Sequence, residues 1–318
     1  APVNFLKNDK LEILPLSGIS NKKTILCNEH GYNAIYKSDR YGFNNPDLEW
    51  DKKNIDFLLV GDSFTHGTCV NTPDSIAGIL RKLNKNTGVI TLGYMANGPL
   101  LEYASLKEYL PIVKPKNVIW LYYENDLWDL KFELKNKILL NYLNDNKFSQ
   151  NLYQKQDQIN EIVQKQLDIF ESDFKNSARV NTNYSIKKFI KLHNLRIFFK
   201  SLSNEKMLRT ISPQFKSIIK LAHDYVKKNQ SNFYFVYIPE YKRYKKNLQN
   251  DYSFNDYEKV INYVKSLNIP TIDLNEELFQ KNKDPLSLYP FRKRAAGFSP
   301  EINVIVTDII YNKIKQNN

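Results

Sequence analysis

A serine at the end of a short apolar run is the first residue of this sequence whose setting favours chemistry. The run Ile55–Val60 is typical of a buried parallel strand, and Gly61-Asp62-Ser63 follows it directly. A serine nucleophile needs its hydroxyl on such a tight turn, hydrogen-bond donors for the developing oxyanion, and a base. Two further strand ends carry donors, because Gly93 offers a backbone N–H and Asn125 a side-chain amide. Ligands bind beyond the carboxyl ends of parallel strands, so these residues are expected to converge there.

Alternating strands and helices must position these residues. Short apolar runs predict strands over Ile55–Val60, Val89–Leu92, Val118–Tyr123, Phe233–Ile238 and Pro270–Leu274. Apolar residues at helical spacing, preceded by cap residues or Pro, predict helices over 72–83, Pro99–Leu110, the stretch after Ser212-Pro213, Tyr257–Leu267 and the stretch after Ser299-Pro300. This alternation predicts an α/β fold with an open, mostly parallel sheet.

Two regions interrupt the alternation and set the domain boundaries. Residues 1–50 are full of turn formers and aromatics, which predicts an irregular N-terminal arm with one short hairpin. Residues 51–318 are expected to form one domain, with a helical insertion over about 127–205. Within the insertion, the runs Leu130–Leu143, Asp157–Phe174 and Ile186–Leu202 are expected to be helical.

Composition and charge narrow the classes of partner. The chain has 318 residues, 42% of them hydrophobic, which is enough for a sizeable core. Its formal net charge of +12 would attract acidic glycans or anionic lipid headgroups, although scattered Lys and Asn favour compositional drift. The basic cluster Lys242-Arg243-Tyr244-Lys245-Lys246 favours a solvated loop over a docking site for a membrane or an acidic glycan. No zinc-knuckle or ribonucleoprotein motif occurs, so we expect no nucleic-acid partner. No apolar run in the sequence approaches the length that crosses a bilayer.

The two cysteines, Cys27 and Cys69, bear on the cellular compartment. No CxxC motif surrounds them, and two thiols alone cannot complete a four-ligand zinc site. They are either two buried free thiols or a disulfide, and a disulfide would close a loop worth roughly 4 kcal/mol. The pair Cys27–Cys69 is the expectation to test. It implies a cell-envelope, periplasmic or secreted protein, with the cytoplasm as the alternative.

The strand ends resemble the sequence blocks of the SGNH, or GDSL-like, hydrolase superfamily. The stretch Phe57–Gly67 resembles its first block, Thr91-Leu92-Gly93 its glycine block, and Tyr123–Asp126 its asparagine block. In the arm, Cys27-Asn28-Glu29 and Tyr36–Asn45 resemble a bacterial subset that occurs with cell-surface polysaccharide and acyl-transfer functions.

This resemblance implies a fold and a set of roles. The fold would be a three-layer α/β/α, flavodoxin-like architecture. Ser63 would be the nucleophile, and the N–H groups of Ser63 and Gly93 with the amide of Asn125 would form the oxyanion hole.

The sequence departs from the superfamily at the base. The superfamily places a His just before the last helix, in a Gly-His-Phe-Ser-Pro-Glu context with an Asp three residues earlier. Here Gly297 occupies the His position and Arg294 the Asp position. An Arg cannot serve as a base.

Other histidines are the alternative candidates for the base. His66 lies three residues after Ser63, and His30 lies in the arm that is expected to fold over the cleft. His193 and His223 are most simply surface or packing residues.

Two functions follow from these observations. The first is ester hydrolysis or acyl transfer through Ser63 on an acylated glycan or similar ester, impaired by the replacement at Gly297. The alternative is a catalytically inactive SGNH-like pseudoenzyme that binds a glycan or a partner protein. Neither requires a cofactor or a metal ion, so we expect none. Glu124 and Asp126 could also form a carboxylate pair for glycoside hydrolysis, but structural roles are favoured for both.

Overall fold

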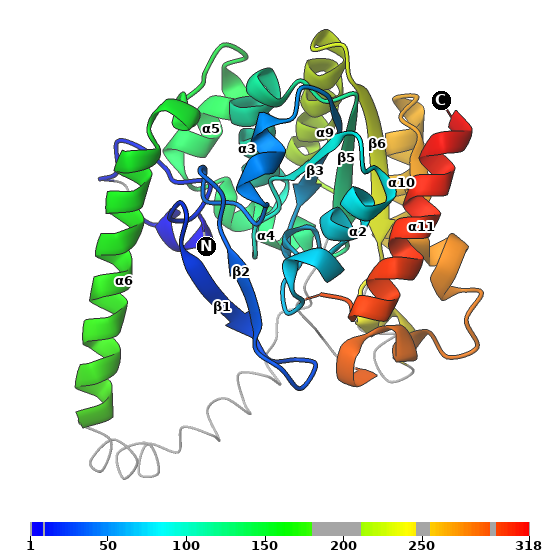
Figure 1. Ribbon diagram of the computed structural model, residues 1–318. Helices are drawn as coiled ribbons and strands as arrows, with labels where there is room; N and C mark the ends of the chain where they lie inside the picture. Colours follow the sequence, from blue (N-terminus) through cyan, green and yellow to red (C-terminus); the bar gives the residue numbers. More distant parts are fainter. Residues whose placement is uncertain (1, 9, 180–210, 246–254, 293–296, 318) are drawn as a thin grey trace.

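A five-stranded parallel sheet forms the centre of the molecule (Figure 1). The computed structural model describes residues 2–8, 10–179, 211–245, 255–292 and 297–317. In spatial order the strands are β4 (Gly88–Thr91), β3 (Ile55–Gly61), β5 (Asn117–Tyr123), β6 (Asn232–Ile238) and β7 (Thr271–Asp273). Counted from β3, this is the order 2-1-3-4-5 of flavodoxin-like folds. The predicted α/β/α class is confirmed, and each predicted strand agrees with its observed bounds within one residue.

Two hydrophobic cores lie on opposite faces of this sheet. Along β5, Val118, Trp120 and Tyr122 enter one core, while Ile119, Leu121 and Tyr123 enter the other. This alternation follows from the two-residue period of a strand, and both sets are apolar because helices cover both faces.

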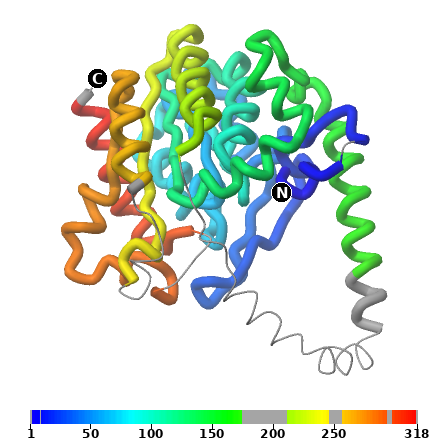
Figure 2. The backbone as a smooth tube through the Cα atoms, turned by 180° about the vertical axis from the view of Figure 1, so that it is seen from behind, coloured from blue at the N-terminus to red at the C-terminus, as the bar shows by residue number. Residues whose placement is uncertain are grey.

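Helices on each side complete the three layers. The first core is covered by α3 (Pro99–Val113), α9 (Pro213–Lys228) and α10 (Asn255–Ser266). The second is covered by α2 (Ile76–Leu83) and α11 (Pro300–Asn317). Figure 1 views the sheet from the α11 side, and Figure 2 views it from the α9 side.

Helix α3 continues past its predicted end at Leu110, through Pro111 to Val113. A proline inside a helix removes the hydrogen bond to the carbonyl four residues earlier. Here that carbonyl belongs to Lys107, and the Tyr225 hydroxyl of α9 donates to it at 3.2 Å. The contact between the two helices therefore satisfies the group that the proline leaves open.

The described part of the insertion differs from its prediction at one point. The run Leu130–Leu143 is divided between α4 (Asp126–Glu133) and α5 (Lys137–Asn144). Asn136 separates them, because its side chain accepts from Leu139 N and donates to the Leu6 carbonyl of the arm. A third helix, α6 (Gln156–Arg179), contains the predicted run Asp157–Phe174. The predicted helix Ile186–Leu202 lies outside the described residues.

The N-terminal arm contains the expected hairpin. Strands β1 (Lys23–Cys27) and β2 (Ala34–Lys37) pair antiparallel. The remainder includes the short 3₁₀ helices Pro2–Phe5 and Asp47–Asp51. Apolar arm residues, including Leu14 and Phe43, are fully buried in the first core. The arm is thus packed onto the sheet layer rather than extended from it.

A disulfide joins the arm to the rest of the molecule. Cys27, at the end of β1, is bonded to Cys69, three residues beyond the first short helix after β3. Their Cα atoms lie 5.1 Å apart. The expected pairing is confirmed, and it fixes the hairpin beside the turn that carries Ser63. None of the helices described is both long and apolar enough to cross a membrane.

Candidate active site

Ser63 opens the short helix α1 (Ser63–His66) immediately beyond β3. Asp62 is the N-cap of this helix, and its Oδ1 accepts from Phe64 N at 2.9 Å. Gly61 has φ +153°, and a Cβ there would lie 2.1 Å from Thr65 Oγ1. The turn therefore requires glycine at 61, and it places Ser63 at the carboxyl end of a central strand.

The Ser63 hydroxyl is hydrogen-bonded to its own neighbour. Ser63 Oγ donates to Asp62 Oδ2 at 3.2 Å, while Asp62 Oδ1 is held by the helix cap. The Asp62 side chain is buried, and burial raises its pKa to about 6, against the lowering effect of its hydrogen bonds. Ser63 itself is half-buried.

Asn125 lies beyond β5, the strand next to β3. Gly61 pairs with Leu121 in the parallel register, so both chains leave the sheet at the same edge. Asn125 occupies the N-cap position of α4, yet its side chain makes no capping hydrogen bond. Its Oδ1 is buried without a hydrogen-bond partner among the described residues. An Asn at this position normally caps the helix, so its release from capping leaves the amide available for another role.

Asp126 stabilises the turn between β5 and α4, the helix that the Asn125 side chain does not cap. Its Oδ2 accepts from Tyr123 N at 2.8 Å. Glu124 points elsewhere, because it accepts from Glu240 N and forms an ion pair with Arg243. The two carboxylates thus have separate structural partners, as favoured over a glycosidase pair.

Gly93 closes the site from β4. A Cβ on Gly93 would lie 2.6 Å from His66 N, so only glycine lets this loop pack against α1. Its N–H donates to Thr91 Oγ1 at 3.2 Å, and Thr91 Oγ1 donates to the Thr65 carbonyl at 3.0 Å. To stabilise an oxyanion, this N–H must therefore turn away from Thr91 Oγ1 or donate to Thr91 Oγ1 and the oxyanion together.

Two asparagines of the arm hold the loops that carry the site, and sequence reasoning missed their roles. The Asn45 side chain accepts from Thr91 N at 2.8 Å and donates to the Thr91 carbonyl at 3.0 Å. The Asn44 amide donates to the His66 carbonyl at 2.8 Å. The only sequence signal was the resemblance of Tyr36–Asn45 to the bacterial subset, which gave no contact for either residue.

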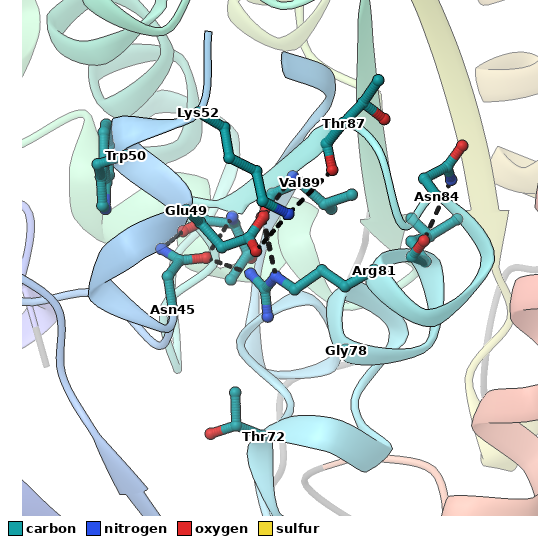
Figure 3. A network of polar contacts seen from close by, with 12 residues as sticks. Asn45, Glu49, Trp50, Lys52, Thr72, Gly78, Arg81, Asn84, Thr87 and Val89 are labelled. Carbon is teal, nitrogen blue, oxygen red and sulfur yellow. Dashed lines mark hydrogen bonds and ion pairs between the residues drawn. The ribbon is translucent and has the colours of Figure 1, made fainter. Parts of the chain in front are cut away.

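Around Asn45, a polar network joins the arm, α2 and β4 (Figure 3). Arg81 of α2 donates to Asn45 Oδ1 at 2.5 Å and to the Val89 carbonyl at 3.0 Å. Glu49 accepts from Val89 N at 2.9 Å and pairs with Lys52 at 2.8 Å. Side chains of the arm thus bind the backbone of β4 on the side where this edge strand has no neighbouring strand.

His66 is packed into the interior. Its ring is 1% exposed and stacks on Tyr94 with 4.8 Å between the ring centroids. Its Nδ1 lies 3.3 Å from Thr68 Oγ1. Burial lowers the pKa of His66 to about 3, which makes the ring a weak base at neutral pH. These contacts favour a packing role.

His30 lies in the turn of the arm's hairpin. Its Nε2 atom is buried without a hydrogen-bond partner among the described residues. The pKa of Glu301, in the first turn of α11, is lowered by the Ser299 side chain and to a smaller extent by His30. The hairpin turn therefore lies near the start of α11, as both backbone views show (Figures 1 and 2). No hydrogen bond joins His30 or His66 to Ser63, all three being described residues.

Gly297 lies next to the turn that follows Ser63. A Cβ at this position would lie 2.7 Å from the Thr68 carbonyl oxygen. The neighbouring Phe298 packs on Phe64, with 4.6 Å between ring centroids. The segment therefore lies beside α1, but Thr68 backbone fills the space that a side chain at 297 would enter. Its assignment as the replaced His position stays a prediction, and Arg294 and His193 lie outside the described residues.

Two lysines of the basic cluster lie beside an acidic or an aromatic side chain. In the basic cluster, Lys242 pairs with Glu240 at 3.4 Å, and Lys245 lies 5.8 Å from the centre of the Tyr241 ring. His223, on α9, contacts Phe233 at the start of β6, the opposite end of the sheet from Ser63. In the described part of the chain, no group of three His, Cys, Asp or Glu residues is arranged to hold a metal ion.

Comparison with known proteins gives structural matches alone. No protein-family profile and no curated protein sequence matches this chain. One similar structure is a lipase/acylhydrolase from Enterococcus faecalis, at TM-score 0.45 and 13% identity, covering 83% of this chain and 96% of that one. Another is a catalytic mutant of an acetylxylan esterase from Geobacillus stearothermophilus, at TM-score 0.44 and 13% identity, covering 83% and 96%.

A third is a GDSL-like lipase from Bacteroides thetaiotaomicron, at TM-score 0.41 and 11% identity, covering 84% of this chain and 90% of that one. By their names these are a lipase/acylhydrolase, an acetylxylan esterase and a GDSL-like lipase, and the last name is that of the class whose sequence blocks this chain resembles. Because the likeness is weak, the function is argued below from the residues of this chain.

Proposed function

We propose that this protein is an SGNH-type serine hydrolase or acyltransferase that acts on an ester through Ser63. The observation that carries the proposal is the convergence of Ser63 and Asn125 beyond two adjacent parallel strands, β3 and β5. This is the point where the strand order reverses, which is where ligands bind in such sheets. The uncapped amide of Asn125 supplies a donor with no competing structural role.

The reaction would form an acyl-enzyme. Ser63 Oγ attacks the ester carbonyl carbon, and the negative charge that develops on the carbonyl oxygen is stabilised by the Asn125 amide and by backbone N–H groups. The alcohol leaves, and water or an acceptor hydroxyl then takes the acyl group from Ser63. Gly93 N–H contributes if it turns from Thr91 Oγ1 towards the oxyanion.

We further propose an acylated glycan as the ester, in an oxidising compartment. The disulfide Cys27–Cys69 supports the compartment, since such bonds persist where thiols are oxidised. The arm supports a glycan substrate, since its sequence resembles a subset associated with cell-surface polysaccharide. The arm is also part of the site, because its asparagines bind the loops that carry the site residues. The net charge of +12 would also favour an acidic polymer or an anionic membrane surface nearby.

The second candidate function is glycan or protein binding without catalysis. It is favoured by one observation, that the Thr68 carbonyl occupies the space of a side chain at Gly297. Loss of the base in triad enzymes costs roughly 10⁶ in turnover.

Hydrolysis of p-nitrophenyl acetate separates the two functions. An enzyme is expected to turn over this ester, and Ser63→Ala should remove the activity. Ser231→Ala is the matched control, because it removes a buried hydroxyl that donates to the Pro115 carbonyl at the other end of the sheet. Equal rates for the wild type and Ser63→Ala would leave the binding function as the better account.

A further inference from the structure

The proton of the Ser63 hydroxyl needs an acceptor, and none of the described histidines is hydrogen-bonded to Ser63. His66 is stacked in the core, and His223 lies at the far end of the sheet. A side chain at Gly297 would collide with the Thr68 backbone. Among the described residues, Asp62 is the side chain that accepts a hydrogen bond from the Ser63 hydroxyl.

Asp62 is in that contact. The two oxygens of its carboxylate accept from different donors. Oδ1 accepts from Phe64 N at 2.9 Å, and Oδ2 accepts from the Ser63 hydroxyl at 3.2 Å. The helix cap thus fixes the orientation of the carboxylate, and the free lone pairs of Oδ2 face the serine. A base must lie within hydrogen-bond reach of the proton it takes, and 3.2 Å is at that limit.

Two further buried carboxyls on neighbouring elements interact electrostatically with Asp62. Glu102 is on α3 and Asp126 is at the start of α4, and the charge of Asp62 raises the pKa of both carboxyls. Asp126 Oδ1 is buried without a hydrogen-bond partner among the described residues, and Trp120 is the hydrogen-bonding neighbour of the buried Glu102 carboxyl. The charges of Glu133 and Asp129 also raise the pKa of Glu102, so the surroundings of Glu102 are acidic.

The cluster distributes its protons unequally. Burial, followed by repulsion from neighbouring carboxyls, raises the pKa of Glu102 and of Asp126 well above the ordinary range. Asp62 is different, because hydrogen bonds from Phe64 and Ser63 offset part of its burial and hold its pKa at about 6. Of these three carboxyls, Asp62 is therefore the one that loses its proton most readily. Environments that separate the pKa values of neighbouring carboxyls assign the acid and base roles.

We propose that Asp62 is the general base for Ser63, with the buried Glu102 and Asp126 as positioning residues. The inference rests on the proposed function of Ser63. As Ser63 Oγ bonds to the ester carbon, its proton passes to Asp62 Oδ2, and the carbonyl electron pair moves onto the oxyanion. The tetrahedral centre then expels the alcohol oxygen, which takes the proton back from Asp62. In the second half, water or an acceptor hydroxyl gives its proton to Asp62 as it attacks the acyl group. The bond between the acyl carbon and Ser63 Oγ then breaks, and Ser63 Oγ takes the proton from Asp62, which restores the free enzyme.

Asp62→Asn tests the base role. Asn is as good an N-cap as Asp and keeps an acceptor for Phe64 N, but it cannot take a proton. The kcat for p-nitrophenyl acetate should fall by roughly 10²–10⁴ with little change in KM. Wild-type kcat/KM should rise with pH through an apparent pKa of about 6, because the base must be ionised. Asp56→Asn, the same change near the other end of β3, should stay within about twofold.

Retained kcat in Asp62→Asn would overturn the proposal. It would also be overturned if His30→Gln lost activity and no longer showed the rise of kcat/KM with pH through about 6. The second outcome would assign the base to the hairpin turn.

A titration that needs no turnover keeps the proposal separate from the proposed function. The Asp62 carboxyl carbon can be followed by ¹³C NMR against pH in the wild type and in Ser63→Ala. The Ser63 hydroxyl stabilises the ionised carboxyl, so its removal should raise the pKa of Asp62, whereas Ser231→Ala should leave it unchanged. An unchanged Asp62 titration in Ser63→Ala would show that the contact is absent and overturn the base role. If the contact is present but Ser63→Ala keeps full turnover, the proposed function fails instead.

Discussion

At the scale of single residues, Asn125 offers the sharpest test of the oxyanion geometry. Its amide makes no capping bond, and its Oδ1 has no hydrogen-bond partner among the described residues. Asn125→Ala should therefore cost little stability but lower kcat by roughly 10²–10³, as loss of one oxyanion donor does. Steady-state kinetics and a denaturant melt on the same variant check both halves. A large loss of stability with unchanged kcat would show that the amide is structural.

Gly297 gives a second prediction at this scale. Placing His there to rebuild the superfamily's base should fail, because even a Cβ would lie 2.7 Å from the Thr68 carbonyl oxygen. We expect Gly297→Ala and Gly297→His each to lower the free energy of unfolding by about 1–3 kcal/mol, the range for overpacked sites. Urea melts would measure the loss and ester hydrolysis the activity. A gain in turnover with wild-type stability would contradict this account of Gly297.

The residues of the site were predictable to different degrees. Ser63 and Asn125 follow strands that apolar runs identify, and strand ends meet at one edge of a parallel sheet for geometric reasons. The roles of Asn45 and Glu49 were not predictable, because each binds backbone of a strand far along the chain. The hydrogen bond between Ser63 and Asp62 depends on one side-chain rotamer, which the sequence does not specify.

At the scale of elements, the arm acts as a clamp on β4 and α1. Asn45→Ala would leave the N–H and the carbonyl of Thr91 without their partners in a buried place, at about 1–3 kcal/mol for each group. We expect a clear drop in melting temperature and a lower kcat, since Gly93 follows two residues later. Asn146→Ala, on an exposed loop, is the matched control and should change neither.

The disulfide belongs to the same element. Replacing Cys27 and Cys69 by Ser should cost about 2–4 kcal/mol, because the bond closes a loop between residues 42 positions apart. Unfolding of the wild type with and without reductant should show the same difference. Two free thiols in the unfolded, unreduced protein would contradict the pairing.

The order of elements was predictable, but the breaks within them were less so. Strand bounds were correct because each apolar run ends at a Gly, a Pro or a polar residue. The division between α4 and α5 was missed because Asn136 binds the arm, a tertiary contact that helical periodicity does not contain.

At the scale of the whole molecule, buried carboxyls should make stability fall with rising pH. Burial raises the pKa of Glu133 to about 8 and that of Glu102 well above its ordinary value. A carboxyl whose pKa is raised on folding contributes stability below its unfolded pKa and loses it as pH rises through the folded one. His66 has the opposite sign, because its lowered pKa costs stability as pH falls below about 6.5.

The window from pH 6.5 to pH 8 isolates the carboxyl effect. The free energy of unfolding should fall there by on the order of 1–2 kcal/mol per buried carboxyl. Glu102→Gln should raise stability at pH 8 more than at pH 6.5, whereas Glu161→Gln, an exposed change on α6, should alter neither. Denaturant melts at the two pH values measure this, and a parallel response of both variants would contradict it.

The central claim is that Ser63 still attacks an electrophile, and covalent labelling tests it most directly. Intact-mass spectrometry after incubation with a fluorophosphonate at pH 5 to 9 should show a single adduct. Peptide mapping should place that adduct on Ser63, labelling should disappear in Ser63→Ala, and it should slow strongly in Asp62→Asn. The absence of an adduct at any pH, or an adduct that persists in Ser63→Ala, would contradict the account.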